Sequence, residues 1–313
     1  MAHGSSGGTT PAICVVGAGL IDLISYVPRL PRLGQTLHGS DFQMGFGGKG
    51  ANQAVLAAKL GARVSMVTKL GRDLFGENML ANFDSLGIDT THVSIADGVS
   101  SGVAPIAVDA NGDNAIIIVT GANAVMTTDD IERARPAIAT AGVLVCQLQI
   151  ELEITQAALE VAREESTRTI LNPAPAVDDL PADLFELAGV LCSSEPETEL
   201  LLGRPIGPGE ELEAAHELLC RGARAVVLTL GARGCVVVSA SERIHLPVEV
   251  VEPQDTTGAG DAFVGSLAYF LARGEPLTTA AERANRIAAV SVQARGTQTS
   301  FPSASELPAE LLA

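Results

Sequence analysis

The sequence predicts an α/β fold in three layers, in which helices cover both faces of a mainly parallel sheet and a small β-sheet lid lies beside it. The first observation is that short apolar runs alternate with helical patterns of about 10–15 residues, which is typical of parallel sheets. The second is that 47% of the residues are hydrophobic but only 3% are aromatic. The core must therefore consist mainly of Ala, Val, Leu and Ile, as buried parallel strands prefer.

Each expected element has its own local signal. The Ala-rich helix over 49–61 stops at Gly61, and the next helix, over 76–87, stops at Gly87. Glycine is common directly after a helix because it adopts the left-handed conformation easily. Further helices are expected over 127–140, 151–165, 209–222 and 261–274. Strands are expected over 12–19, 63–71, 143–148, 168–172, 189–193 and 225–231, with a strand-like run over 242–253.

Two stretches interrupt this alternation and predict the lid. Residues from about 20 to 46 contain Pro, Gly and short apolar pieces, and residues from about 99 to 121 read as two short strands. Asn111-Gly112 between those two strands is a strong hairpin signal. We expect the lid to close over a site or to pair with a second copy through its edge strands.

These elements are expected to form one domain over residues 12–305, with the lid inserted and a C-terminal tail over 306–313. Residues 1–11 open with "MAHGSSGGTT", which has neither the basic start nor the apolar segment of a signal peptide. We expect them to be a disordered leader or a remnant of cloning. No apolar run approaches the roughly 18 residues of a membrane span.

Charge and cysteine usage exclude several classes of protein. The net charge is −17, from 37 acidic and 20 basic residues, which argues against binding to nucleic acid or to an anionic membrane. The five cysteines show no metal-ligand spacing, and four of them lie in strand-like runs: Cys14, Cys146, Cys192 and Cys235. We interpret all five, including Cys220, as reduced core residues of a cytoplasmic protein.

Glycine-rich loops contain the candidate chemistry, and the first is "VVGAGLID". A dinucleotide fingerprint would need a third glycine where Asp22 stands. The loop is therefore a tight exit from a strand, a degenerate dinucleotide fingerprint, or a place where Asp22 holds a polar ligand.

The second loop is "GFGGKGANQA", over 45–54. It is not a nucleotide P-loop, because Gly50 stands where a P-loop needs Ser or Thr after the lysine. Either it is a simple turn, or its glycines allow a ligand to approach the backbone while Lys49 and Asn52 bind it.

The third loop, "DTTGAGDAFVG" over 255–265, lies where a helix is expected to begin. Helix N-termini expose unpaired N–H groups and a partial positive charge, and bare glycines let those groups face an anion. Asp261 in the first turn could then accept the proton of an attacking hydroxyl, as the base does in kinases. The alternative is that Asp261 only caps the helix.

The second and third loops together resemble the PfkB carbohydrate kinases. "GGKGANQA" and "DTTGAGDAF" look like the two signatures of that family, and "GANAVMTTDDI", "LNPAPA", "TLGARG" and "VSVQARGTQTS" are similar to its ribose-phosphorylating members. The resemblance covers the chain from about Ala12 to Pro302. It implies ATP-dependent phosphorylation of the 5-hydroxyl of D-ribose, with Mg²⁺ accompanying ATP, K⁺ as an activator and a homodimer formed through the lid.

The resemblance also implies roles for individual residues. Asp261 matches the catalytic base, and the anion hole consists of Gly258, Ala259 and Gly260. The substrate-binding positions are Leu20, Asp22, Gly48, Lys49, Gly50, Asn52, Gln149 and Asp261. The ATP-binding positions are Ser194, Thr229, Leu230, Gly231, Ala232, Arg233, Gly234, Gly260 and Asn285. The potassium positions are Asp255, Thr257, Ser291, Ala294, Gly296 and Ser300, and Glu197 matches an indirect, water-mediated contact to magnesium.

Three positions depart from the commonest pattern of those family members. Leu20 stands where an Asn is frequent, although some members have an apolar residue there. Gln149 stands where a Glu is usual, which implies weaker sugar affinity or a different sugar preference. Ser194 replaces an Asn that contacts the nucleotide phosphates, which implies weaker use of ATP but not its loss.

Two alternative functions stay open. One is a kinase for another small sugar or nucleoside, such as deoxyribose, fructose or adenosine, because Gln149 alters the expected sugar contacts. The other is a ribose or nucleotide sensor that kept the fold without catalysis, because Ser194 and Gln149 both depart from the pattern. The intact "GAGD" favours an enzyme.

Overall fold

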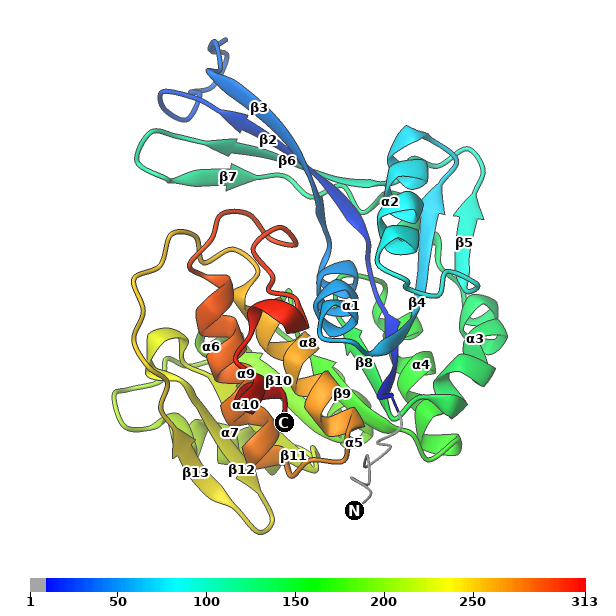
Figure 1. Ribbon diagram of the computed structural model, residues 1–313, viewed down its shortest axis with the longest axis vertical. Coiled ribbons are helices and arrows are strands. Elements are labelled where there is room, and N and C mark those ends of the chain that lie inside the picture. Colours follow the sequence, from blue (N-terminus) through cyan, green and yellow to red (C-terminus); the bar gives the residue numbers. More distant parts are fainter. Residues whose placement is uncertain (1–9) are drawn as a thin grey trace, which may run out of the picture.

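The computed structural model describes residues 10–313 and contains a nine-stranded sheet in the order β13-β12-β11-β10-β9-β8-β1-β4-β5 (Figure 1). All pairs from β11 to β5 are parallel, whereas β12 and β13 are added antiparallel at one edge. The strands are β1 Ala12–Val16, β4 Arg63–Gly71, β5 Val93–Ala96, β8 Val143–Gln147, β9 Arg168–Asn172, β10 Val190–Ser194, β11 Ala225–Thr229, β12 Cys235–Ser239 and β13 Arg243–Leu246.

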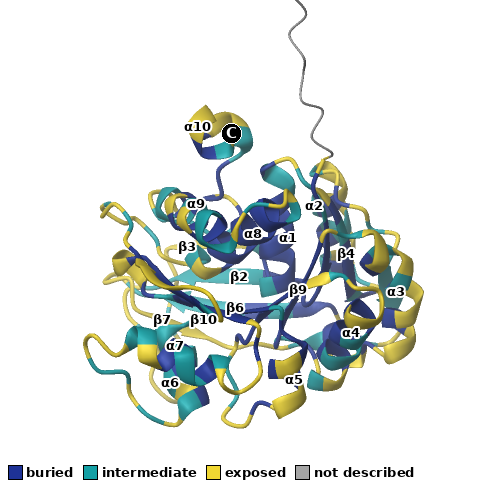
Figure 2. Ribbon diagram, turned by 90° about the horizontal axis from the view of Figure 1, so that it is seen from below, coloured by how far each residue is buried: buried dark blue, intermediate teal, exposed yellow. Residues whose placement is uncertain are grey.

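Helices cover both faces of this sheet, because successive strand residues point to opposite sides. In β1, Ile13 and Val15 enter one apolar cluster while Cys14 and Val16 enter the other. The first cluster includes residues of α1 Lys49–Lys59, α2 Leu74–Ser85, α8 Ala259–Ala272, α9 Leu277–Ser291 and α10 Ala309–Leu312. The second includes residues of α3 Thr128–Thr140, α4 Leu152–Glu164, α5 Ala182–Leu187, α6 Glu195–Leu202 and α7 Glu211–Leu219. Figure 2 shows the buried sheet between helices with exposed outer faces.

A separate four-stranded sheet forms the lid, in the order β3-β2-β6-β7. Its strands are β2 Leu20–Tyr26, β3 Asp41–Gly47, β6 Gly102–Val108 and β7 Asn114–Ile116. The sheet extends away from the main body above α1 (Figure 1). The predicted turn at Asn111-Gly112 joins β6 to β7, and Gly112 has a φ of 89° there. The predicted three-layer fold and its small lid sheet are thus confirmed.

The strand-like run over 242–253 differs from expectation. It forms a strand only as far as Leu246, and that strand is antiparallel. Pro247 and Pro253 explain the early end, because proline has no N–H to donate to a sheet ladder. The short edge strand β5 and the helices α5, α6 and α9 were not predicted as separate elements.

The two ends of the described chain are better anchored than the sequence indicates. Of the expected leader, residues 1–9 lie outside the described residues, but Pro11 is buried and its carbonyl accepts a hydrogen bond from the Arg63 N–H. The expected C-terminal tail contains α10 and buries Leu307 and Leu311 against the first apolar cluster.

The interpretation of the cysteines needs one correction. Four are buried in strands of the sheet, but Cys220 is exposed at the end of α7, because it follows the last apolar position of that helix. All five are free thiols. Within residues 10–313, no helix has the length and apolarity to span a membrane.

Candidate active site

The loop after β1 and the start of α1 pack directly against each other. Gly48 is the N-cap of α1 with a φ of 90°, and a Cβ there would lie 2.6 Å from the Ala18 carbonyl oxygen. A Cβ at Gly50 would lie 2.7 Å from the Gly17 carbonyl carbon. The glycines of "GGKG" are therefore required by packing, whatever ligand their backbone also meets.

Asp22 lies on β2, where the lid joins the main body. A Cβ at Gly47 on the paired strand would lie 2.4 Å from both Asp22 carboxylate oxygens, so only glycine leaves room for them. Burial, with a contribution from the negative charge of Asp261, raises the pKa of Asp22 to about 6. The structure thus brings the two predicted carboxylates into one electrostatic environment.

The N-terminus of α8 has the geometry of an anion site. Gly258 is its N-cap with a φ of 79°, and the first helical hydrogen bond runs from the Ala262 N–H to the Gly258 carbonyl. The N–H groups of Gly260 and Asp261 precede that bond, so they have no acceptor inside the helix. A Cβ at Gly260 would meet nothing within 4 Å, so the side-chain position of Gly260 is open.

Asp261 is the buried carboxylate at this helix start, with 6% of its surface exposed. Asn52 Nδ2 donates to its Oδ2 at 2.8 Å, and Gln53 Nε2 donates to its Oδ1 at 2.9 Å. Both donors come from α1, more than 200 residues away in sequence. The carboxylate is therefore fixed in place and aimed by two neutral amides, with no basic side chain among its hydrogen-bond donors.

The two sugar-side positions Gln149 and Leu20 have local partners. Gln149 Oε1 accepts a hydrogen bond from the Lys49 backbone N–H at 2.9 Å, so it caps the start of α1. Leu20 is 2% exposed, and its Cδ2 lies 2.3 Å from where a Cβ at Gly102 would stand. Leu20 is thus packed between the lid strands.

The predicted nucleotide positions lie along the carboxyl ends of the later strands. Ser194 ends β10 and is in register with Thr229, which ends β11. The turn after β11 needs Gly234, which has a φ of 89° and a virtual Cβ 2.1 Å from the Leu246 carbonyl oxygen. In this turn the Leu230 N–H donates to the Gly234 carbonyl, and Gly231 to Arg233 form a short 3₁₀ helix.

Three other predicted ligand positions already have protein partners. The Arg233 guanidinium forms ion pairs with Glu195 and Glu211. Asn285 is buried on α9, and its Nδ2 donates to the Leu246 carbonyl at 3.2 Å. One oxygen of Glu197 accepts a hydrogen bond from the Ser194 N–H, so Glu197 also acts in the capping of α6.

The predicted potassium positions form one loop pair beside α8. Asp255 Oδ1 accepts from the Thr257 N–H and Oδ2 accepts from the Gly296 N–H, each at 2.9 Å. Burial acts to raise the pKa of Asp255, but these hydrogen bonds outweigh burial and hold the pKa below its usual value. Ser291 and Ser300 donate their hydroxyls to the Ala288 and Thr297 carbonyls. The Ala294 N–H donates to the Ser291 carbonyl.

Sequence reasoning missed the amides around Asp261. Gln53 contacts Asp261 directly, and Gln298 Nε2 donates to Asn52 Oδ1 at 3.0 Å. Asn172, at the end of β9, accepts from Gln53 Nε2 at 3.1 Å. All three lie within the quoted motifs, but only the fold reveals that they meet, because each contact joins segments more than 100 residues apart.

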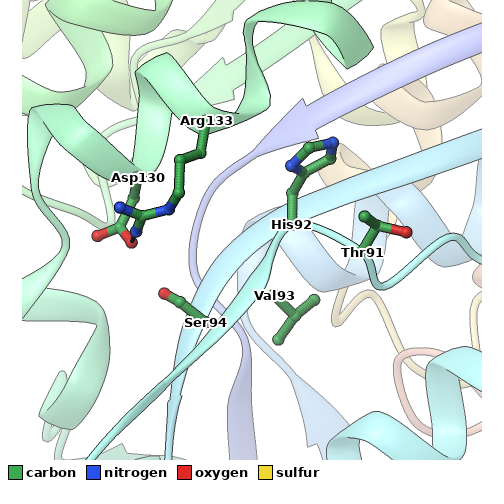
Figure 3. Close-up of a pocket in the computed structure, with 6 residues that line it drawn as sticks. All are labelled: Thr91, His92, Val93, Ser94, Asp130 and Arg133. Atoms are coloured by element: carbon green, nitrogen blue, oxygen red, sulfur yellow. Dashed lines mark hydrogen bonds and ion pairs between the residues drawn. The ribbon is translucent and has the colours of Figure 1, made fainter.

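Two cavities among the described residues lie away from this site. One of about 300 Å³ is lined by the start of β5 and by Asp130 and Arg133 of α3 (Figure 3). Asp130 there forms ion pairs with Lys69 and Arg133, and its carboxylate caps its own helix. Another of about 690 Å³ lies at the amino ends of β9 and β10. Neither is lined by a predicted site residue.

The comparisons with known proteins agree with this geometry. The sequence profile of the "pfkB family carbohydrate kinase" matches residues 10–304. The chain is 44% identical to a ribokinase of Mus musculus, over 96% of this chain and 94% of that protein. It is 39% identical to a deoxyribokinase of Salmonella typhi, over 93% of this chain and 95% of that protein.

Solved structures show the same similarity. The Arabidopsis thaliana ribokinase complexed with ribose and ATP has a TM-score of 0.88 and 28% identity, covering 97% of this chain and 99% of that one. The Thermotoga maritima ribokinase has a TM-score of 0.86 and 32% identity, covering 95% and 97%. The match of the family profile over nearly the whole chain, together with these relatives, shows that the chain belongs to the pfkB family of carbohydrate kinases.

Proposed function

We propose that this protein phosphorylates D-ribose at its 5-hydroxyl with ATP, giving D-ribose 5-phosphate and ADP. One observation carries the proposal: a buried carboxylate, Asp261, lies in the first turn of a helix, next to the Gly260 N–H group, which has no acceptor inside that helix. Proton acceptor and anion site are thus adjacent. The similarity to named ribokinases supports ribose as the substrate.

In this mechanism the sugar lies below the lid, between Asp22 and the start of α1. The Asp22 carboxylate accepts hydrogen bonds from sugar hydroxyls, while the Lys49 ammonium and the Asn52 amide donate to sugar oxygens. Three fixed groups of different charge select the orientation of the sugar and leave its 5-hydroxyl facing Asp261. Such positioning supplies a large part of the rate in reactions of this kind.

ATP lies across the carboxyl ends of β10 and β11, with its γ-phosphate at the N–H groups of Gly258 and Gly260. The Ala259 N–H, also expected in the anion hole, already donates to the Thr256 carbonyl at 3.2 Å. Asp261 takes the proton of the 5-hydroxyl as that oxygen bonds to the γ-phosphorus. The bond between the γ-phosphorus and its bridging oxygen breaks, and ADP leaves. The N–H groups at the start of α8 stabilise the charge on the transferring group.

We propose Mg²⁺ and K⁺ as the ions of this reaction. Glu197 uses one carboxylate oxygen in capping α6 and has a second to hold a magnesium-bound water. Asp255 is the one carboxylate among the predicted potassium positions, and the others would offer hydroxyl and main-chain carbonyl oxygens, which suit a large monovalent cation. When bound, the ions would neutralise charge on the phosphates and tune the field at the α8 N-terminus.

We also propose that two copies associate through the lid in the cytoplasm. Six apolar side chains of the lid or its hairpin are 45–65% exposed: Phe42, Met44, Ile116, Ile117, Ile118 and Val119. Phe42 and Met44 lie on the edge strand β3, and the other four lie on or after the opposite edge strand β7. Exposed apolar side chains at sheet edges favour pairing with another chain. The free thiols and the net charge of −17 are consistent with this setting.

A second candidate substrate is 2-deoxy-D-ribose. A relative named deoxyribokinase is 39% identical to this chain. Gln149 points the same way, because its neutral amide caps α1 and contributes no charge to the sugar site.

The test is ADP release by the purified protein with MgATP, across D-ribose, 2-deoxy-D-ribose, D-fructose and adenosine, each with and without K⁺. The proposal predicts the highest kcat/KM with D-ribose and a rise with K⁺. Higher kcat/KM with 2-deoxy-D-ribose would reassign the substrate. Sugar binding by calorimetry without ADP release on any substrate would indicate a sensor.

A further inference from the structure

A line of side-chain amides leads from the surface of α2 to Asp261. Asn82 Nδ2, on α2, donates to Gln298 Oε1 at 2.9 Å. Gln298 Nε2 donates to Asn52 Oδ1 at 3.0 Å, and Asn52 Nδ2 donates to Asp261 Oδ2 at 2.8 Å. We name Asn82, Gln298 and Asn52, in this order, the amide relay. It joins the loop over 292–303, through two side chains, to the carboxylate of the proposed base.

The direction of every bond in the amide relay is set by Asp261. An ionised carboxylate only accepts hydrogen bonds, so Asn52 must turn its Nδ2 toward it. The Asn52 Oδ1 then faces Gln298, which must in turn present Nε2, and the Gln298 Oε1 faces the Asn82 Nδ2. Reversing any one amide would place two acceptors or two donors against each other.

A second arm on the other carboxylate oxygen obeys the same rule. Gln53 Nε2 donates to Asp261 Oδ1, so its Oε1 must accept, and Gln147 Nε2 donates to it at 2.6 Å. Gln147 Oε1 is left buried with no hydrogen-bond partner among the described residues. This unsatisfied acceptor is the last group in a series of hydrogen bonds that runs from Asp261 through Gln53 to Gln147, and Asp261 sets the direction of each bond in it.

Gln298 is held firmly enough to act in this way. It is 7% exposed, and its main-chain carbonyl accepts a hydrogen bond from Lys59 Nζ at 2.7 Å. The same Lys59 Nζ donates to the Phe301 carbonyl at 2.8 Å. The loop is therefore anchored to α1, the helix that also supplies Asn52.

We propose that Gln298 is a positioning residue for Asp261, and that the amide relay keeps the carboxylate aimed through the common polarity of its amides. Aligned amide dipoles reinforce one another, so opposing the polarity at the outer end disturbs the base more than removing the outer end does. This inference rests on the proposed function, because it assigns Gln298 a role in the same reaction.

Asn82 allows the two effects to be separated at one position, since it is half-buried and makes no contact with Asp261. Asn82→Leu removes the amide that donates to Gln298 Oε1, and it adds no acceptor that would oppose the polarity of the relay. Asn82→Asp presents a carboxylate to Gln298 Oε1, which forces that amide to turn its Nε2 outward and its oxygen toward Asn52. Ala81→Asp, on the exposed neighbour, is the control for added charge. Gln156→Met, at a half-buried glutamine of α4 whose Nε2 donates to Glu160 of the same helix, is the control for Gln298→Met.

We expect Asn82→Asp to lower kcat roughly 10- to 100-fold, a range typical of small misplacements of a reacting group. Asn82→Leu and Ala81→Asp should stay within about twofold of the unmodified enzyme, and KM for MgATP should be unchanged in all three. Gln298→Met should lower kcat by a similar factor, whereas Gln156→Met should not.

The double variant Asn82→Asp with Gln298→Met completes the test. Without the Gln298 amide, the carboxylate introduced at position 82 can no longer reverse the amides that lead to Asp261. Its kcat should equal that of Gln298→Met alone, a non-additive result. Equal effects of Asn82→Asp and Asn82→Leu, or additive losses in the double variant, would overturn the amide relay. If the unmodified enzyme instead fails to phosphorylate any sugar, the proposed function fails first, so the two failures are distinguishable.

Discussion

Asp261 shows how far a single residue can be interpreted from sequence. Its place after "GAG" predicts a carboxylate in the first turn of a helix, and the structure places it there, buried at the N-terminus of α8. Its hydrogen-bond donors could not be predicted, because Asn52 and Gln53 lie 209 and 208 residues away. Local patterns indicate helices and loops, but which polar side chains meet depends on how β1, α1 and α8 pack.

Asp261→Asn is expected to lower kcat by roughly two to four orders of magnitude, because the amide cannot accept the proton of the 5-hydroxyl. One amide of α1 can still donate to the oxygen of the new side chain while the other meets its NH2 group, so the variant should fold but unfold at a lower temperature. Steady-state ADP release and thermal unfolding check this together. An unchanged kcat would show that Asp261 is not the base.

Asp22 gives a pH dependence of stability. Its pKa of about 6 in the folded protein lies above the value of 3.8 expected in the unfolded chain. The folded state therefore binds this proton more tightly, and the stability that it contributes is present below pH 3.8 and lost as pH rises through about 6.

Asp22→Asn should consequently be more stable than the unmodified protein at pH 7–8, with a difference that fades toward pH 4. Chemical unfolding without sugar, at several pH values, measures this. A variant that is less stable at pH 8 would contradict the burial argument.

The same ionisation should govern sugar binding. Below about pH 6 Asp22 is neutral and accepts fewer hydrogen bonds from sugar hydroxyls. KM for D-ribose should therefore rise as pH falls from 8 to 5, while KM for MgATP stays nearly constant. Parallel changes in both KM values would point to another titrating group.

At the scale of elements, strand and helix patterns predicted the sheet and the lid, and failed at the edges. The sequence of β12, "CVVVS", is an ordinary apolar run, and nothing in it distinguishes a parallel strand from an antiparallel one. The helix α9 was missed because its mixed polar surface lacks the clear glycine stops of 49–61 and 76–87. Positions of turns and caps, such as Gly258, were predictable because they need a special conformation.

Two glycines at opposite ends of α8 allow an effect on stability to be distinguished from an effect on activity. Gly258 has a φ of 79°, and a Cβ there would lie 2.6 Å from Thr297 Cγ2. Gly274 has a φ of 86°, and a Cβ there would meet nothing within 4 Å. Alanine at either position should lower the free energy of unfolding by about 1–2 kcal/mol, because a residue with a Cβ is strained in the left-handed region.

Gly258→Ala alone should also lower kcat, by roughly tenfold or more, because it displaces the loop that shapes the anion site. Thermal unfolding and steady-state kinetics of both variants check this. Equal activity of the two variants would mean that the α8 N-terminus does not hold the transferring phosphate.

At the scale of the whole molecule, the lid sheet was predicted from two interruptions of the α/β alternation, but the exposed apolar side chains at its two edges were not. Which lid side chains stay exposed follows only from the arrangement of β3, β2, β6 and β7 (Figure 1). We expect these side chains to hold two copies together.

Ile117→Lys, at a side chain that is 65% exposed, should convert a dimer into monomers by placing a charge in that interface. Leu200→Lys, at an exposed apolar side chain on α6 outside the lid, is the control and should leave the dimer intact. Light scattering after size-exclusion chromatography measures both. A dimer that survives Ile117→Lys would move the interface elsewhere, and a monomeric unmodified protein would remove it.

The most direct test of the account is the identity of the phosphorylated product. The purified protein, with MgATP, K⁺ and D-ribose, should give one product with phosphate on O5, by mass spectrometry and nuclear magnetic resonance, and Asp261→Asn should give almost none in the same time. Phosphate on another hydroxyl, or equal product from the variant, would contradict the arrangement of sugar, base and anion site proposed here.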